Sequence, residues 1–336
     1  MKRKVVMPVE TGGFTMEDFP EELEAEFIIS PAKNQDEVIA LTWDADAIIT
    51  SVTPPITKGV IDSLQKCQII HFIGAGYDSI NVEAATDAGI CVSFAGDYCA
   101  EEVAEHTVAL MLACARKIVR LDRAVRQGKW DSIKRQAIRE IWRPMYKING
   151  QVLGLIGFGQ VAKMIVPKAS GLGLKIIAYD PLVSDDVFDD FGVGRVVLDE
   201  LLSRSDYVSI NCALVPETEH LLDLEQFKKM KATAYLINAA RGGIICEPDL
   251  HKALSDGYIA GAALDVVEEE RIGLDNPLLQ LDKVILTAHS AFYSEQSGSL
   301  QRQRAYEQIG QVFRGEWPTW LANPEVKDKY MGRWSE

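Results

Sequence analysis

The sequence predicts an α/β protein of two domains, each built on a parallel sheet. Short apolar runs rich in β-branched residues alternate with helix-length segments, a pattern typical of strands buried on both faces of parallel sheets. These runs fall into two series with a long helical segment between them. The length of 336 residues permits two full hydrophobic cores.

The predicted elements define the domain boundaries. The first series of strands covers 5–7, 47–50, 68–74 and 90–94. The second series covers 151–157, 174–180, 207–211, 234–238, 262–266 and 284–287. Between the two series, apolar residues at helical spacing predict one helix from Tyr98 to about Arg120, which we expect to be buried. We therefore expect a discontinuous first domain, 1–101 with 293–336, and a second domain over 102–292.

Charge and composition narrow the function. The net charge of −14 disfavours nucleic-acid binding, because the few cations would have to gather on one face. The longest apolar run, 108–115, is too short to cross a bilayer, and the N-terminus lacks the pattern of a signal peptide, so we expect a cytoplasmic protein. The six cysteines are scattered, so we predict neither a metal site nor a disulfide framework.

A glycine-rich turn follows the predicted strand that ends at Ile156. It reads Gly157-Phe158-Gly159-Gln160-Val161-Ala162, which matches the G-x-G-x-x-A form of the dinucleotide-binding fingerprint. The next strand ends at Asp180, where a carboxylate would accept hydrogen bonds from a ribose 2′-OH and repel a 2′-phosphate. The pattern predicts a Rossmann domain that binds NAD in preference to NADP. An ordinary strand–helix turn is the alternative for the glycines alone.

Charged residues follow three later strands of the second series. Arg241 comes just after the strand 234–238, Asp265 ends the strand before Glu268, Glu269 and Glu270, and His289 follows the strand 284–287. Each alone could be a surface charge. In a doubly wound sheet, however, ligands bind beyond the carboxyl ends of the strands, so these residues are expected to converge.

The chain resembles the D-isomer-specific 2-hydroxyacid dehydrogenases. The motifs that carry the resemblance occur in the family's order over nearly the whole chain: GAGYDSINVEAATDAGI, EEVAEHTVALML, GLIGFGQVA, AYDP, VPETEHLL, NAARGGIICEPDLHKAL, GAALDVVEEE and AHSAFYSEQS. Within the family, DYCAEEVAEH and HSAFYSEQ most resemble the branch of the C-terminal-binding-protein corepressors and their bacterial enzyme relatives.

The resemblance implies roles for individual residues. Arg241 would bind the substrate carboxylate and carbonyl, His289 would be the general acid/base, and Glu270 would hold its imidazole. Asp265 would meet the nicotinamide amide. Further cofactor contacts would come from Gly157, Phe158, Gly159, Gln160, Val161, Asp180, Cys212, Thr218, Ala239 and Thr107.

The resemblance also assigns the domains. The discontinuous domain would be a smaller, flavodoxin-like substrate domain, whose backbone at Ala75 and Gly76 cradles the carboxylate. The middle domain would be the Rossmann NAD-binding domain, and the active site would lie in the cleft between them.

The chain departs from the family at several positions. Ala288 and Arg271 stand where a proline is common, and Phe292 stands where the corepressors have tryptophan. Phe72 replaces an arginine found in the same branch two residues before the first glycine of the GAGY motif. If its ring points into the cleft, Phe72 favours monocarboxylic 2-keto acids with short uncharged side chains; core packing is the alternative.

The predicted function is reversible hydride transfer between NADH and a small 2-keto acid. Two alternatives remain: a 3-phosphoglycerate dehydrogenase, and a non-enzymatic NAD(H)-sensing scaffold like the corepressors. Retention of Arg241, Glu270 and His289 together argues against the scaffold. We also expect a homodimer, formed through the region 98–146.

Overall fold

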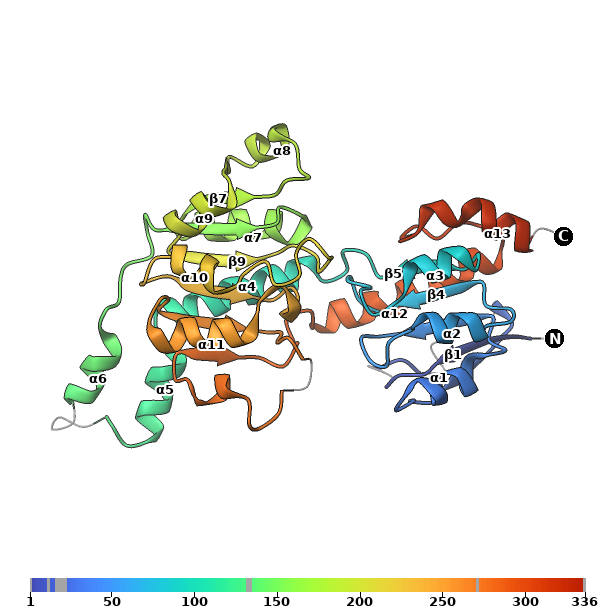
Figure 1. Cartoon of the computed structure of the whole chain (residues 1–336), viewed down its shortest axis with the longest axis horizontal. Helices are drawn as coiled ribbons and strands as arrows, with labels where there is room; N and C mark the ends of the chain where they lie inside the picture. The colour runs from blue at the N-terminus through green and yellow to red at the C-terminus, as the bar shows by residue number, and fades with distance from the viewer. Residues whose placement is uncertain (1, 11–12, 16–22, 131–134, 270–271, 335–336) are drawn as a thin grey trace. The chain divides into compact units, whose positions relative to one another are not determined.

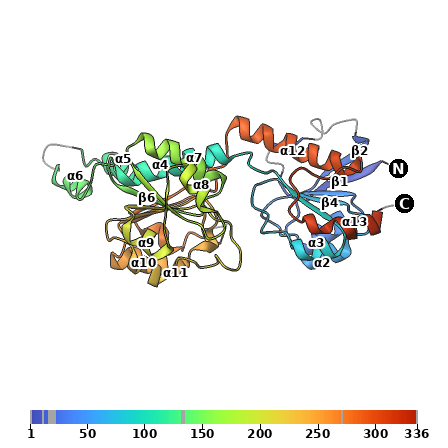
Figure 2. The same cartoon turned by 90° about the horizontal axis from the view of Figure 1, so that it is seen from above.

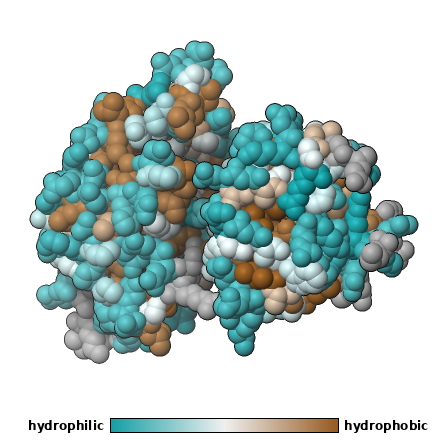
Figure 3. Space-filling model, turned by 45° about the vertical axis from the view of Figure 1, so that its right-hand side comes forward, coloured by the Kyte–Doolittle hydropathy of each residue, from teal (hydrophilic) through white to brown (hydrophobic). Residues whose placement is uncertain are grey.

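The computed structural model describes residues 2–10, 13–15, 23–130, 135–269 and 272–334. The chain divides into two compact units (Figure 1). The first unit combines Met1–Cys99 with Tyr293–Glu336, and the second is Ala100–Phe292. On the face seen in Figure 3, hydrophilic side chains cover most of the surface, with apolar patches among them.

The first unit is a five-stranded parallel sheet covered on both faces. Its strands are β1 (Arg3–Met7), β2 (Ala25–Ile29), β3 (Ala47–Thr50), β4 (Ile69–Phe72) and β5 (Cys91–Phe94), in the order β2-β1-β3-β4-β5. This is the flavodoxin-like order. One face packs against α12 (Glu295–Phe313), and the other against α1 (Gln35–Thr42), α2 (Lys58–Ser63) and α3 (Val82–Asp87) (Figure 2). The chain ends with η4 (Pro324–Val326) and α13 (Lys327–Trp334).

The second unit is a seven-stranded parallel sheet. Its strands are β6 (Val152–Ile156), β7 (Lys175–Tyr179), β8 (Gly194–Arg195), β9 (Tyr207–Ile210), β10 (Tyr235–Asn238), β11 (Gly261–Leu264) and β12 (Val284–Leu286). The order β12-β11-β10-β9-β6-β7-β8 is the Rossmann order with one added strand. The predicted α/β fold with two parallel sheets is therefore confirmed.

Two layers of helices enclose this second sheet (Figure 2). The helices α4 (Ala100–Ala115), α7 (Gln160–Gly171) and α8 (Asp185–Asp190) pack on one face. The helices α9 (Leu198–Arg204), α10 (Leu224–Lys229) and α11 (Glu247–Asp256) pack on the other. Short 3₁₀ turns, η2 (Gly242–Ile244) and η3 (Pro277–Gln280), follow β10 and precede β12.

The single helix predicted from Tyr98 to about Arg120 is wrong. The structure has α4, which ends at Ala115, and then a separate helix α5 (Ile118–Arg126). The break lies at Lys117, which adopts left-handed backbone angles (φ 54°) and donates its N–H to the carbonyl of Cys114. A left-handed residue cannot continue a right-handed helix, so the apolar periodicity crosses a helix boundary.

Beyond α5, the helix α6 (Arg135–Trp142) projects from the second unit (Figure 1). None of the helices in the described ranges combines the length and apolar character that crossing a bilayer requires.

Candidate active site

Six strands of the second unit end at one edge of the sheet. The pairing is parallel, and the last residues of neighbouring strands stand opposite one another: Ile156 with Tyr179 and Ile210, and Leu264 with Asn238 and Leu286. The residues that follow these strands therefore share that edge, as the sequence predicts. They include Gly157, Asp180, Cys212, Ala239, Arg241, Asp265 and His289.

The glycine-rich turn has the shape of a phosphate cradle. Gly157 has φ 87°, and a Cβ there would lie 2.6 Å from the backbone nitrogen of Cys212, so only glycine fits. A Cβ on Gly159 would have no neighbour within 4 Å in the described part of the chain. Gly159 begins α7 without a side-chain cap, which leaves the first N–H groups of the helix for an anion. These features fit the pyrophosphate of a dinucleotide.

Asp180 is fixed beside this turn. Its Oδ2 accepts a hydrogen bond from the N–H of Phe158 (2.8 Å), and its Oδ1 accepts one from the N–H of Leu182 (2.9 Å). The Phe158 ring is fully buried and stacks on Phe188 (4.7 Å between centroids), so Phe158 presents only backbone at the turn. Gln160 is exposed and Val161 half-buried in the first turn of α7.

The turn after β10 positions Arg241. The fully buried Asn238 accepts the N–H of Ala240 on its Oδ1 (3.0 Å) and donates from Nδ2 to the carbonyl of Arg241 (2.9 Å). A Cβ on Gly242 would lie 1.9 Å from the carbonyl oxygen of Val267, so the turn lies tightly on the loop after β11. The hydrogen bonds of Asn238 and the close approach of Gly242 to Val267 therefore hold the backbone from which the guanidinium of Arg241 extends.

Asp265 organises the loop that carries His289. Its side chain is buried, and its Oδ1 accepts from Thr287 Oγ1 (2.5 Å) and the N–H of Ser290 (3.0 Å), while Oδ2 accepts from the N–H of Ala291 (2.9 Å). Its carbonyl accepts the N–H of His289 (2.8 Å). The carboxylate is thus engaged by its own loop. Any contact with a nicotinamide amide stays a prediction.

His289 is held in an unusual backbone conformation. Its φ of 48° is left-handed, which is costly for a side chain other than glycine and persists where neighbouring bonds enforce it. The half-buried imidazole lies edge-on to Phe292, with 6.3 Å between ring centroids. Asp265, Thr287 and His289 line a cavity of about 250 Å³, together with apolar side chains that include Ile272 and Leu286.

His106 is a further residue of this site, and the sequence pattern does not predict it. It lies on α4, and its Nε2 is 3.0 Å from Thr287 Oγ1 and 3.6 Å from Asp265 Oδ1. His106 therefore joins α4 to the loop of His289. Its neighbour Thr107, an expected cofactor contact, is buried on the same helix. Nothing in the strand pattern marks His106, because it stands within a helix distant in sequence from β11.

Three glutamates follow one another in the loop after β11, and the structure describes the first two of them. The Oε1 of Glu268 lies 2.6 Å from Nε2 of His220, and Oε2 accepts the N–H of Glu247 (3.1 Å). Glu268 is thus paired with a histidine other than His289. Glu269 is exposed. Glu270, the expected partner of His289, lies outside the described residues.

The remaining expected cofactor contacts lie along the same edge. Cys212 and Ala239 are half-buried at the ends of β9 and β10. Burial raises the pKa of the Cys212 thiol to about 11. The hydroxyl of Thr218 donates to the carbonyl of Ala213 (2.7 Å) and accepts the N–H of Val215 (2.9 Å), which shapes the loop after β9.

The expected substrate residues of the first unit follow β4. Ala75 is exposed and Gly76 half-buried in the loop after that strand. Phe72 is 3% exposed within the apolar core, and a Cβ on Gly74 would lie 2.6 Å from its ring. The ring therefore packs beneath the glycine loop. Its burial favours the core-packing alternative, and the substrate preference argued from an inward-pointing Phe72 loses its support.

Comparison with known proteins identifies the family. The family model of the D-isomer specific 2-hydroxyacid dehydrogenase NAD binding domain matches residues 108–291. The chain belongs to this family. The matched residues lie within the second unit, so that unit contains the NAD-binding domain.

Individual relatives agree with this assignment. A glyoxylate reductase of Korarchaeum cryptofilum is 38% identical over 293 residues, 86% of each chain. A D-3-phosphoglycerate dehydrogenase of Methanocaldococcus jannaschii is 36% identical over 307 residues, which is 91% of this chain and 57% of that one.

A solved structure extends the similarity to the whole fold. The D-lactate dehydrogenase from Aquifex aeolicus, in complex with NAD and lactic acid, has a TM-score of 0.80 at 26% identity and covers 94% of this chain and 96% of its own. The protein is an NAD-dependent oxidoreductase of the family that acts on CH–OH groups. The corepressor-like branch stays a prediction. Among the described residues, no group of three or more His, Cys, Asp or Glu side chains could hold a metal ion.

Proposed function

We propose that the protein interconverts a small 2-keto acid and its D-2-hydroxy acid, with Arg241 binding the substrate and His289 as general acid/base. The arrangement of Arg241, Asp265 and His289 at the ends of β10, β11 and β12 is the observation that carries this proposal. A guanidinium and an imidazole on one sheet edge supply an anion clamp and a proton donor for a single substrate.

Each side chain has a defined part in the reaction. NAD(H), when bound, supplies or accepts the hydride. Arg241 holds the substrate carboxylate in parallel hydrogen bonds and stabilises negative charge on the carbonyl oxygen. Protonated His289 gives its proton to that oxygen as the carbon is reduced; in the reverse direction, neutral His289 takes the proton from the hydroxyl.

We propose Glu270 as the carboxylate that favours the protonated imidazole. Its place in the motif supports this role, and the engagement of Glu268 by His220 removes a competing acid. Glu270→Gln should shift the acidic pKa of the pH–rate profile downward, because the imidazolium loses its anion. An unchanged profile would assign the role to Glu269 or to no carboxylate.

NAD is the proposed cofactor in preference to NADP. The carboxylate of Asp180 is anchored next to the glycine turn, where it can accept from a ribose 2′-OH and repels a 2′-phosphate. NADH should support a much higher kcat/KM than NADPH. Asp180→Ala should reduce this difference between the two cofactors. Equal efficiency with both cofactors in the unchanged protein would contradict this assignment.

For the substrate, we propose a monocarboxylic 2-keto acid with a short uncharged side chain, such as glyoxylate, pyruvate or hydroxypyruvate. The similarity to glyoxylate reductases over 86% of both chains supports this choice. A 3-phosphoglycerate dehydrogenase is the second candidate, favoured by the relative that is 36% identical. A higher kcat/KM for phosphohydroxypyruvate than for the monocarboxylic acids would decide for this second candidate.

The deciding experiment is a kinetic screen. NADH oxidation would be followed with a panel of monocarboxylic and dianionic 2-keto acids. His289→Ala should lower kcat by roughly 10²- to 10⁴-fold while NADH still binds, and Arg241→Ala should raise KM and lower kcat. His251→Ala, on α11, is the matched control and should keep full activity. NADH binding without turnover of any 2-keto acid would support the corepressor-like scaffold instead.

We also propose a homodimer formed through the region 98–146. Large apolar side chains are exposed there on α5, α6 and the segment between them: Ile118 (54%), Val125 (39%), Trp130 (80%) and Trp142 (39%). Light scattering should give twice the mass of one chain, and Trp130→Asp should lower the measured mass. A monomer at micromolar concentration would contradict this proposal. The cytoplasmic location stays a prediction.

A further inference from the structure

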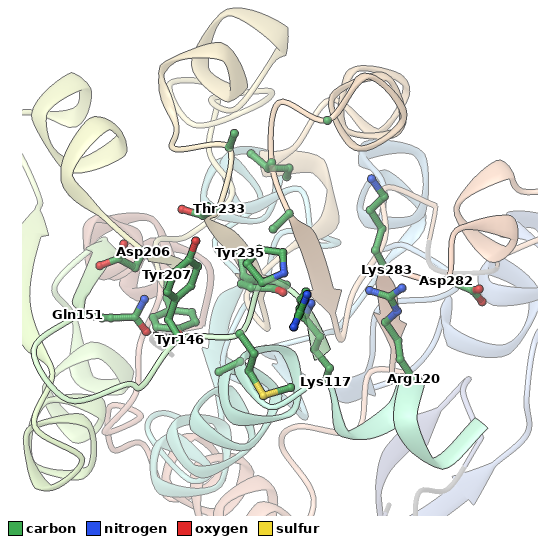
Figure 4. A pocket seen from close by; sticks show the side chains of 18 residues that line it. Lys117, Arg120, Tyr146, Gln151, Asp206, Tyr207, Thr233, Tyr235, Asp282 and Lys283 are labelled. Atoms are coloured by element: carbon green, nitrogen blue, oxygen red, sulfur yellow. Dashed lines mark hydrogen bonds between the residues drawn. The ribbon is translucent and has the colours of Figure 1, made fainter. Parts of the chain in front are cut away.

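A second cavity of the NAD-binding unit lies at the opposite edge of its sheet from the candidate active site. It has a volume of about 410 Å³ and is lined by residues that precede or begin β6, β9, β10, β11 and β12, with the segment 143–146 as a further wall (Figure 4). A strand of four residues is roughly 13 Å long, so the sheet separates this cavity from the edge that carries Arg241 and His289.

The cavity is lined by cations whose charge the lining acids do not offset. Lys117, Arg120, Arg143 and Lys283 line it, against the two acids Asp206 and Asp282. Both acids are engaged by cations outside this group: Asp206 Oδ1 lies 2.9 Å from Lys231 Nζ, and Asp282 Oδ1 lies 2.8 Å from Arg123 Nη1. Four positive side chains therefore share one cavity in a protein of net charge −14.

Lys117 is the most constrained of the four. It is 6% exposed, and within the described part of the chain it makes neither a hydrogen bond through its side chain nor an ion pair. Burial and the neighbouring Arg120 lower the pKa of Lys117. Lys117 lines the cavity, and an ammonium beside Arg120 without a counter-charge is available to an anion. The left-handed backbone at Lys117 adds strain at the same position.

The other cations are also available to a ligand. Arg120 and Arg143 have no acidic partner among the described residues, and Lys283 Nζ is bonded to the carbonyl of Leu254 (2.6 Å) rather than to a carboxylate. Figure 4 places Arg120 and Lys283 on one side of the cavity and Tyr207 with Gln151 on the other.

Two tyrosines add aromatic surface to the lining of the cavity. The rings of Tyr207 and Tyr235 are stacked 6.2 Å apart, and the Tyr207 hydroxyl donates to Gln151 Oε1 (2.7 Å). Cationic groups and aromatic rings in one cavity of this size are suited to a small organic anion.

We propose that this cavity is a binding site for a small phosphate-bearing molecule, held by Lys117, Arg120 and Lys283. A phosphate or diphosphate carries enough negative charge to neutralise several of these cations, and arginine and lysine are its usual donors. The site is separate from the cofactor site, because the phosphate turn at Gly157 lies at the other edge of the same sheet. It binds an effector or a stabilising anion, and this inference stands independently of the substrate proposed above.

Pyrophosphate is the probe for the first test. Its binding would be measured by calorimetry in the presence of saturating NAD⁺, which blocks the pyrophosphate position of the cofactor site, and at constant ionic strength. We expect saturable binding and a higher Tm with pyrophosphate than with acetate. Lys117→Met and Arg120→Met should each weaken binding by about tenfold or more, since hydrogen bonds to charged groups are the strong ones. Arg204→Gln, which removes an exposed cation of α9, is the charge-matched control.

A second readout uses the ligand-free protein. Because the Lys117 ammonium lies beside Arg120 and makes no ion pair among the described residues, Lys117→Met should leave Tm unchanged or raise it; a lower Tm would mean that the ammonium has a structural partner and would overturn the proposal. Pyrophosphate binding that is absent, or equal in Lys117→Met and the unchanged protein, would also overturn it. Lys117, Arg120 and the segment 143–146 also lie in the region 98–146 proposed for the homodimer, so light scattering completes the test. Pyrophosphate should leave the molar mass of the homodimer unchanged, whereas a fall to the mass of one chain would mean that the anion displaces a second copy from the cavity and would overturn the proposal.

Discussion

Replacing Asp265 with asparagine should show whether this residue mainly positions the loop of His289. The carboxylate accepts three close hydrogen bonds, two on Oδ1 from Thr287 and Ser290 and one on Oδ2 from Ala291. An asparagine can keep the Oδ1 bonds only by turning its NH₂ toward the N–H of Ala291. Two hydrogen-bond donors, the side-chain NH₂ and the N–H of Ala291, would then face each other at a buried site.

The structure sets the size of the effect. A buried N–H left without an acceptor costs about 1–3 kcal/mol, and the two remaining bonds weaken because their acceptor is no longer charged. We take about 3 kcal/mol in total. For a unit of roughly 190 residues, this corresponds to a fall in Tm of about 6–12 °C. Asp256→Asn removes an exposed partner of Lys252 and should change Tm by less than about 2 °C.

The assay separates a positioning role from a cofactor contact. Calorimetry would give Tm, fluorescence titration the Kd for NADH, and steady-state kinetics kcat and KM. If Asp265 positions His289, Tm and kcat fall while Kd changes little. If its main contact is the nicotinamide amide, as the resemblance implies, Kd rises at constant Tm. The second pattern would refute the positioning role.

Two further predictions concern other parts of the chain. Burial lowers the pKa of His71 from 6.5 to about 3, so between those values the unfolded chain binds a proton that the folded chain excludes. The first unit should therefore lose stability as pH falls below 6.5, by up to about 1.4 kcal/mol per pH unit. Tm measured from pH 4 to 8 should depend less on pH in His71→Asn; an equal slope would contradict the assignment. Gly159→Ala should weaken NADH binding without lowering Tm, whereas Gly157→Ala should lower both, because its Cβ meets Cys212; equal losses of Tm would contradict this.

The strands of both sheets were predictable because buried parallel strands leave a strong signal in the sequence. All of the expected strands are present, since each is an apolar run bounded by helix-length segments. The strands β2 and β8 were not expected from the sequence. Both are edge strands, one preceded by acidic residues and the other only two residues long, so neither needs a continuous apolar run.

The cofactor turn was predictable for the same local reason. Its chemistry depends on glycines in sequence and on an acid at the end of the next strand. In contrast, the break at Lys117 was not predictable, because a left-handed lysine has no residue-type signature. The pairing of Glu268 with His220 was also hidden, since these residues are far apart in sequence and meet only through the fold.

The candidate site also shows why charged residues are easier to predict than the residues that position them. Arg241 is held by Asn238 and His289 by Asp265, and both of these polar side chains are buried at or just after strand ends. The N–H of Asp265 in turn donates to the carbonyl of Asn238 (2.8 Å). The backbone that carries the substrate-binding arginine is thus bonded directly to the backbone that carries the acid/base histidine. In sequence, an asparagine at the end of an apolar run predicts only the end of a strand; its role follows from the parallel pairing of β10 with β11, which brings the two turns together.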